Sequence, residues 1–168
     1  FEKNSIDESI DAIFFDANGD EFIDLLVVNG VNEFKKGKPL QPKLYINNNG
    51  TLIEDASQFK NIEMNASTVK AVDIDNDGDL DISITSNLVP REFGKTPKQY
   101  IFENDGKGNF TENTLAWSSE FQNIGNVQDI VWIDLNSDTF LDAILVGHWM
   151  PISVFINDGK KLTLQKQN

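Results

Sequence analysis

Three nine-residue segments place oxygen-bearing side chains at alternating positions. They begin at Asp16, Asp73 and Asp134 and align without gaps, and their recurrence at roughly 60-residue intervals indicates a repeated structural unit. In a turning segment of this kind, positions 1, 3 and 5 converge while the side chains between them point away. Calcium binds in irregular cages of carboxylate, amide and carbonyl oxygens. The segments are therefore predicted to bind up to three calcium ions.

Each segment is expected to supply four side-chain ligands and the backbone carbonyl of position 7. The expected ligands are Asp16, Asn18, Asp20, Phe22 (carbonyl) and Asp24; Asp73, Asp75, Asp77, Asp79 (carbonyl) and Asp81; and Asp134, Asn136, Asp138, Phe140 (carbonyl) and Asp142. Position 6, where the chain must turn sharply, is glycine only at Gly78; Glu21 and Thr139 replace it elsewhere. Segment 73–81 is therefore the best candidate. The alternative is that the segments are solvated turns without metal.

The charge of the chain is concentrated in these segments. The sequence has 27 acidic and 14 basic residues, a net charge of −13, and ten of the aspartates are expected side-chain ligands. Crowded carboxylates repel one another unless a cation neutralises them, so the metal is expected to stabilise the fold. The acidic excess argues against a nucleic-acid partner. Position 8 is apolar in all three segments (Ile23, Leu80 and Leu141) and is expected to pin each segment onto the core.

The surrounding sequence predicts an all-β fold. Short runs rich in Val, Ile and Phe flank each acidic segment, and Asn48-Asn49-Gly50, Asn104-Asp105-Gly106 and Asn157-Asp158-Gly159 mark later hairpin turns. Four antiparallel strands per repeat describe a β-propeller blade, here over 11–56, 69–114 and 127–166. A β-sandwich is the alternative, but it does not explain the repeat. Residues 1–168 are thus expected to form a partial propeller, with the remaining blades supplied by a parent chain or another copy.

Other classes of protein fit less well. An EF-hand requires flanking helices and a glutamate at position 12, where Val27, Ile84 and Leu145 stand. There is no cysteine, no run of roughly 20 apolar residues that would span a membrane, and no GxSxG, Walker A or HExxH motif. No catalytic residue is therefore assigned.

Segment 71–82, Ala-Val-Asp-Ile-Asp-Asn-Asp-Gly-Asp-Leu-Asp-Ile, resembles the FG-GAP/VCBS repeats of integrin-like calcium-binding β-propellers. The stretch 127–157 is further similar to bacterial ASPIC/UnbV-associated, cartilage-acidic-protein-like members. The resemblance implies a seven-bladed ring on the outside of a cell, often in a surface lipoprotein, with calcium bracing each blade. A periplasmic location, or a lipid anchor in a preceding N-terminal region, is also compatible with it.

Ligand contacts are expected on the face opposite the acidic segments, where the longer connections lie. Arg91, Trp117, His148 and Trp149 are the candidates. The tryptophans could stack on a sugar or peptide, or pack between blades; His148 could contact a ligand or be structural. The expected function is binding or adhesion to a protein or glycan at the cell surface. A polysaccharide lyase or other hydrolase, and an architectural subunit of a surface assembly, are the alternatives.

Overall fold

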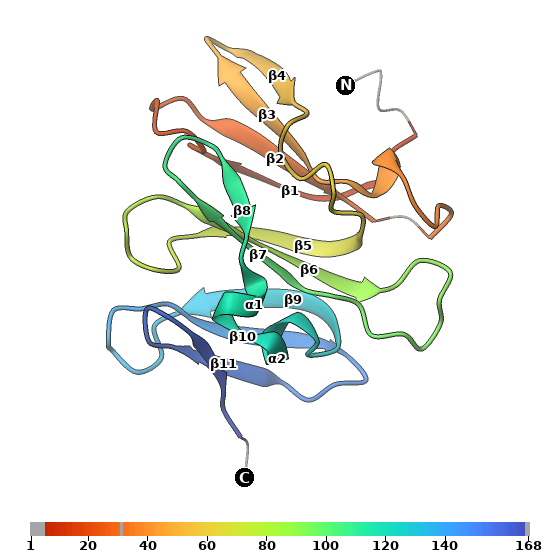
Figure 1. Ribbon diagram of the computed structural model, residues 1–168, viewed down its shortest axis with the longest axis vertical. Helices are drawn as coiled ribbons and strands as arrows, with labels where there is room; N and C mark the ends of the chain where they lie inside the picture. Colours follow the sequence, from red (N-terminus) through yellow and green to blue (C-terminus); the bar gives the residue numbers. More distant parts are fainter. Residues whose placement is uncertain (1–5, 31, 167–168) are drawn as a thin grey trace.

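The computed structural model describes residues 6–30 and 32–166, which form three four-stranded antiparallel sheets (Figure 1). The strands are β1 (Ser9–Phe15), β2 (Asp24–Asn29), β3 (Lys43–Asn48), β4 (Thr51–Asp55), β5 (Asn65–Val72), β6 (Asp81–Leu88), β7 (Tyr100–Asn104), β8 (Phe110–Glu112), β9 (Asn126–Ile133), β10 (Asp142–His148), β11 (Ser153–Asn157) and β12 (Leu162–Leu164). The all-β prediction with four strands per repeat is confirmed. The sheets stack like propeller blades but do not close into a ring.

Each sheet is a simple meander in which consecutive strands pair. The first connection of every sheet is an acidic segment. The second is a longer loop in the first two sheets, but only residues 149–152 in the third, where the sequence predicts a long connection as well. Because strands alternate in direction, these two connections leave opposite ends of the sheet. Figure 1 shows the three acidic segments on the left of the stack and the loops 32–42, 89–99 and 149–152 on the right.

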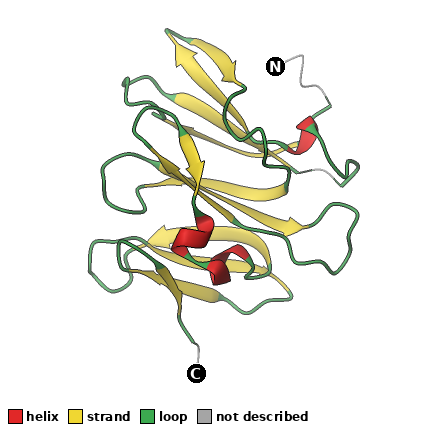
Figure 2. Ribbon diagram, in the orientation of Figure 1, coloured by secondary structure: helices red, strands yellow, loops and turns green. Residues whose placement is uncertain are grey.

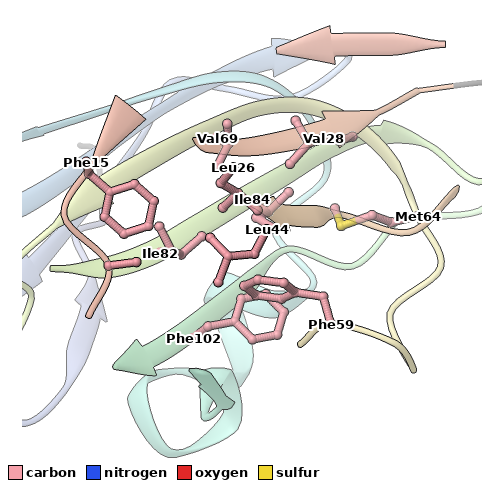
Figure 3. Close-up of a cluster of buried hydrophobic side chains, with 12 residues drawn as sticks. Phe15, Leu26, Val28, Leu44, Phe59, Met64, Val69, Ile82, Ile84 and Phe102 are labelled. Carbon is pink, nitrogen blue, oxygen red and sulfur yellow. The ribbon is translucent and has the colours of Figure 1, made fainter. Parts of the chain in front are cut away.

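An apolar layer fills each junction between sheets. Figure 3 shows the first layer, in which Leu26 and Leu44 of the first sheet meet Ile82, Ile84 and Phe102 of the second. The second layer joins the second and third sheets around Phe121, Ile130 and Phe155, whose side chains are fully buried. Burial of large apolar side chains is the main favourable term in folding, so the two junctions hold the stack together.

Asparagine side chains join the second and third sheets to the sheet before them. The Asn104 Nδ2 donates to the Ala17 carbonyl of the first sheet (2.9 Å), and the Asn157 Nδ2 donates to the Ile74 carbonyl of the second (2.7 Å). Both amides also donate to the position-8 carbonyl of their own sheet. Asn47 makes this last bond in the first sheet, to the Ile23 carbonyl (3.0 Å). The equivalent residues are thus Asn47, Asn104 and Asn157, one position earlier in the first repeat than the turn motifs suggest.

Two single-turn helices occupy the connection that the sequence treats as a long loop. Figure 2 shows α1 (Thr114–Trp117) and α2 (Ser119–Gln122) in front of the second and third sheets. The Ser118 hydroxyl caps α2 by accepting the Phe121 N–H. Trp117 is only 4% exposed, and its Nε1 donates to Glu103 Oε1 (2.6 Å). The expectation that Trp117 contacts a ligand is therefore wrong, because its ring belongs to the second apolar layer.

The two outer faces of the stack carry exposed apolar side chains. Phe14 of β1 is 68% exposed, and Val131 and Ile133 of β9 are about half exposed. Position 2 of the acidic segments shows the same contrast: Ala17 and Ile74 are fully buried under the following sheet, whereas Leu135 is 47% exposed. Within the described residues, the third sheet thus presents the surface that the first two sheets bury.

Candidate metal centre and binding pocket

Position 9 of each acidic segment is a buried aspartate that clamps the loop to its sheet. One carboxylate oxygen of Asp24, Asp81 and Asp142 accepts the N–H of position 2, at 2.9 to 3.0 Å. The other oxygen accepts the backbone N–H of Asn47, Asn104 or Asn157, at 2.8 to 2.9 Å. These bonds tie the first, second and third strands of each sheet together around one carboxylate.

Backbone torsions explain why the segments turn as they do. Position 6 has positive φ in every copy, 69° at Glu21, 99° at Gly78 and 80° at Thr139, as the sequence predicts. Position 4 also has positive φ, at Gly19, Asn76 and Ser137. A left-handed conformation is unfavourable for a β-branched residue such as Thr139. The Thr139 N–H donates to Asp134 Oδ2 (3.0 Å), which holds the turn in place.

The first and third segments satisfy their own polar groups. The Asn18 Nδ2 donates to Asp20 Oδ2 (3.0 Å), and the Asn136 Nδ2 donates to Asp138 Oδ2 (2.8 Å). Desolvation acts to raise the pKa of Asp134, but backbone N–H groups of Thr139 and neighbouring residues outweigh it and the pKa is lowered. A bound cation is therefore not needed to balance the charge at Asp134.

The second segment keeps backbone N–H donors to Asp73 but brings carboxylates together without a side-chain amide between them. Asp73, Asp75 and Asp81 each offer an oxygen, and the three atoms lie within 4.8 Å of one another. No other set of three acidic or histidine side chains in residues 6–30 and 32–166 is arranged in this way. Asp75 stands where the other segments have an asparagine, and a carboxylate cannot donate to the neighbouring aspartate. Asp77, also a predicted ligand, is an exposed residue at the rim of this group.

The pKa values of this group record the crowding. Burial raises the pKa of Asp81 to about 7. Backbone hydrogen bonds from Asn104 and Ile74 act in the opposite direction, and the charges of Asp75 and Asp79 add to the rise. Burial and the neighbouring aspartates raise the pKa of Asp79 to about 6. Burial and the Asp77 charge also raise the pKa of Asp75. These raised pKa values reflect burial first and repulsion between carboxylates second, and a bound cation would offset both.

An unsatisfied atom in the same segment is compatible with a bound cation. Asp79 Oδ1 is buried and has no hydrogen-bond partner, and such atoms are rare in folded proteins. The sequence assigned Asp79 only a carbonyl role, because position 7 of the pattern gives its backbone oxygen. In the structure the charges of Asp73, Asp75 and Asp77 also act on its side chain. An all-oxygen donor set with several carboxylates suits calcium rather than zinc or copper. Asp73, Asp75 and Asp81 would hold the ion.

The metal-free protein is expected to lose stability as pH rises. Because the pKa of Asp81 is about 7 in the folded chain and about 4 when unfolded, the folded state binds more protons between these values; raising the pH from 5 to 8 should destabilise it by about 2 kcal/mol. Urea unfolding in a chelator measures this. Calcium should reduce the decline, and a chelated protein that becomes more stable from pH 5 to 8 would contradict the assignment.

The apolar residues at position 8 do not behave as the sequence predicts. Ile23 is 51% and Leu80 is 36% exposed, while Leu141 is partly buried against the second apolar layer. Position 2 supplies the buried side chain instead, at Ala17 and Ile74. Since position 9 is drawn into the sheet by its two hydrogen bonds, alternation along the chain turns position 8 outward.

A pocket of about 600 Å³ lies on the opposite side of the stack. It is formed by the loop between β6 and β7, the loop between β10 and β11, and the ends of neighbouring strands. The structure brings three of the four predicted ligand contacts together there, namely Arg91, His148 and Trp149. Phe93, which the sequence reading missed, also lines it and is 97% exposed. An aromatic residue two positions after Arg91 in a long loop was the available signal.

Local packing fixes the two loops of this pocket. A side chain at Gly147 would meet the Asn126 carbonyl oxygen at 2.0 Å, so only glycine allows β10 to end against β9 as it does. The next two residues, His148 and Trp149, are thereby presented at the pocket. Arg91 and Trp149 have positive φ, 58° and 56°. Unfavourable backbone conformations of non-glycine residues concentrate at functional sites.

Part of the chain matches a known repeat family. Residues 11–84 match the family model of the FG-GAP-like repeat. The FG-GAP match spans the first sheet and the first hairpin of the second, including the acidic segments 16–24 and 73–81. It supports the FG-GAP part of the resemblance and does not extend to the ASPIC/UnbV or cartilage-acidic-protein subfamily. No curated protein matches this chain.

Proposed function

We propose that this chain is a calcium-stabilised propeller segment of an extracellular binding or adhesion module. FG-GAP repeats are typical of proteins with such functions. The observation that carries the proposal is the division of the stack into two sides. Acidic segments that are bonded into the sheets occupy one side, and an exposed aromatic pocket occupies the other. The metal is therefore structural, and ligands bind at the far side.

Calcium in segment 73–81 would stabilise the fold by strengthening the existing hydrogen-bond network around Asp81. Asp81 joins the Ile74 N–H to the Asn104 N–H, and the amide of Asn104 reaches the first sheet. A cation beside Asp81 neutralises the repulsion that opposes this arrangement. Segments 16–24 and 134–142, which close by their own hydrogen bonds, would bind calcium more weakly.

The proposed location is the outer surface of a cell or the periplasm, with attachment through a lipid anchor in a preceding region. Extracellular calcium is millimolar and fills even weak sites, whereas resting cytosolic calcium would leave them largely empty. No helix in the described part of the chain is long and apolar enough to cross a membrane.

We further propose that blades of the same type cover the two outer faces. The Leu135 carbonyl lies where an asparagine of a following blade would donate, by analogy with the Ala17 and Ile74 carbonyls. Exposed Val131 and Ile133 would be buried by the same contact. Sedimentation of the chain alone, and of a version extended by an adjoining repeat, tests this: the extended version should be monomeric and less prone to self-association. Equal self-association of both would contradict it.

A glycan and protein array tests the binding function. Trp149→Ala should abolish or strongly reduce the strongest signal, since an exposed aromatic ring supplies large contact area. Leu115→Ala, which removes an exposed apolar side chain from α1, is the matched control and should leave binding unchanged. The contrary result would be that substitutions in the acidic segments abolish binding in saturating calcium while Trp149→Ala has no effect. That result would place the binding surface on the side of the acidic segments.

A further inference from the structure

We infer that the pocket at Arg91 and Trp149 binds an acidic polysaccharide, one whose sugar units carry carboxylates. The inference rests on the proposed binding function and specifies its ligand. Two features of the pocket support the inference. The Arg91 guanidinium, which forms no ion pair within the described residues, lies in the same pocket as exposed aromatic rings, and a second hollow continues the first.

Charge is divided across the molecule in a way that suits an anionic ligand. The chain has a net charge of −13, yet the loops 30–42 and 89–99 together carry six basic and two acidic side chains. The acids of the protein concentrate in the segments on the other side. A local basic face on an acidic protein attracts anions to that face and repels them elsewhere.

Arg91 is fixed through its backbone, and its side chain is available to bind an anion. Its backbone N–H donates to Asn32 Oδ1 (2.9 Å), which fixes the residue between the two loops. Glu92 does not neutralise it, because that carboxylate faces Lys95 (2.8 Å) and Lys35 (3.4 Å). The Arg91 guanidinium forms no ion pair with any residue in 6–30 or 32–166. A guanidinium binds a carboxylate through two parallel hydrogen bonds.

Exposed rings next to this cation favour a sugar over a peptide. Trp149 is 87% exposed and meets the Phe93 ring edge-on, with centroids 6.3 Å apart. The centroid of the His148 ring lies 6.2 Å from that of Trp149. Rings fixed by their neighbours and open to solvent offer flat platforms for the apolar faces of sugar rings. Asn32 and Asn126 also line the pocket and offer amide groups for hydroxyls, whereas the Asn87 amide is bonded to Asn65 and Gln128.

The hollow continues past the first pocket, which favours a polymer over a single sugar. A second hollow of about 380 Å³ shares Leu88, Val89 and Lys95 with the first. It extends along the other flank of the loop 89–99 and includes Lys98. A chain with a carboxylate on each unit could thus contact Arg91 in one hollow and a lysine in the next.

Titration calorimetry with an oligomannuronate and its carboxyl-reduced counterpart tests the inference, with calcium present to keep the protein folded. Arg91→Gln should weaken oligomannuronate binding by about 10- to 100-fold, as expected when a charge-assisted hydrogen bond is lost. Lys160→Gln removes the same charge from an exposed residue on the acidic side and should change affinity less than about twofold. Trp149→Ala should weaken both sugars, and Arg91→Gln only the acidic one.

Each other outcome has a defined meaning. Equal binding of the acidic and reduced sugars would overturn carboxylate recognition while leaving the binding function intact. Hexaglutamate binding as tightly as oligomannuronate would overturn the sugar class in favour of acidic peptides. If the array yields a ligand whose binding requires Trp149 but oligomannuronate does not bind, the acidic-polysaccharide inference is overturned and the proposed binding function stands. Absence of any ligand on the array and in the titrations would overturn both the inference and the proposed function.

Discussion

Asn104→Ala is expected to destabilise the folded chain by about 3 kcal/mol, because several buried polar groups lose their partner at once. The Asn104 amide donates to the carbonyls of Ala17 and Leu80, and its oxygen accepts the Gly108 N–H. The side chain therefore joins the first sheet, the acidic segment 73–81 and the turn after β7. Urea unfolding of the wild type and the variant in calcium measures the difference.

Asn109→Ala is the matched control for this change. Asn109 lies in the same turn, is exposed, and its Nδ2 donates only to the nearby Asp105 (2.9 Å). Its loss should cost less than about 0.5 kcal/mol, as is usual at the surface. Equal effects of the two substitutions would mean that the junction between sheets is held by apolar packing alone.

Asp75→Asn should change the stability of the chain in opposite directions with and without calcium. In a chelator the variant should be more stable, by about 1 kcal/mol, because one of the crowded charges is removed. The new amide can also donate to Asp77, as Asn18 does to Asp20 in the first segment. In calcium the variant should be less stable than the wild type, since it loses an anionic ligand. Thermal unfolding in both conditions checks the reversal.

Asp158→Asn controls for the removal of one negative charge on the same side of the stack. Asp158 accepts backbone N–H groups from Lys160 and Lys161, which an asparagine oxygen also accepts. This variant should respond to calcium as the wild type does. If Asp75→Asn shifts the unfolding temperature by the same amount in calcium and in chelator, segment 73–81 does not bind the ion.

The architecture could be predicted from the sequence because the signals for it are local and repeated. Strand-length apolar runs flank each acidic segment, and turn motifs follow at similar intervals, so the strand order within a sheet needs no long-range information. The need for positive φ at position 6 also follows from the loop itself, and Glu21 and Thr139 adopt it despite their side chains.

The details that the sequence did not reveal depend on contacts between sheets. Position 8 turns outward because position 9 is hydrogen-bonded into the sheet, and position 2 is buried only where another sheet covers it. Trp117 is buried because α1 packs over the second junction. The roles of Asn104 and Asn157 in joining sheets need a neighbouring carbonyl, which no single repeat contains.

The candidate binding residues could be predicted partly from their positions in the connections between strands and partly from their aromatic or basic side chains. Arg91 and Trp149 lie in loops that follow the second strand of two different sheets, and His148 is the last residue of such a strand. These loops share one end of the stack. The sequence cannot tell which aromatic residues of these loops face solvent, so Phe93 was missed. Its exposure depends on the loop conformation around Arg91 and Gly94, both of which have positive φ.

The most direct test of this account is thermal unfolding of the wild-type chain in millimolar calcium and in excess chelator. A site that is filled to about 100 times its dissociation constant adds about 2.7 kcal/mol. For a chain of this length that corresponds to a rise in the unfolding temperature of about 5 to 10 °C. We predict that calcium produces this rise. An unfolding temperature that is the same in calcium and in chelator would contradict the assignment of a structural metal to Asp73, Asp75 and Asp81.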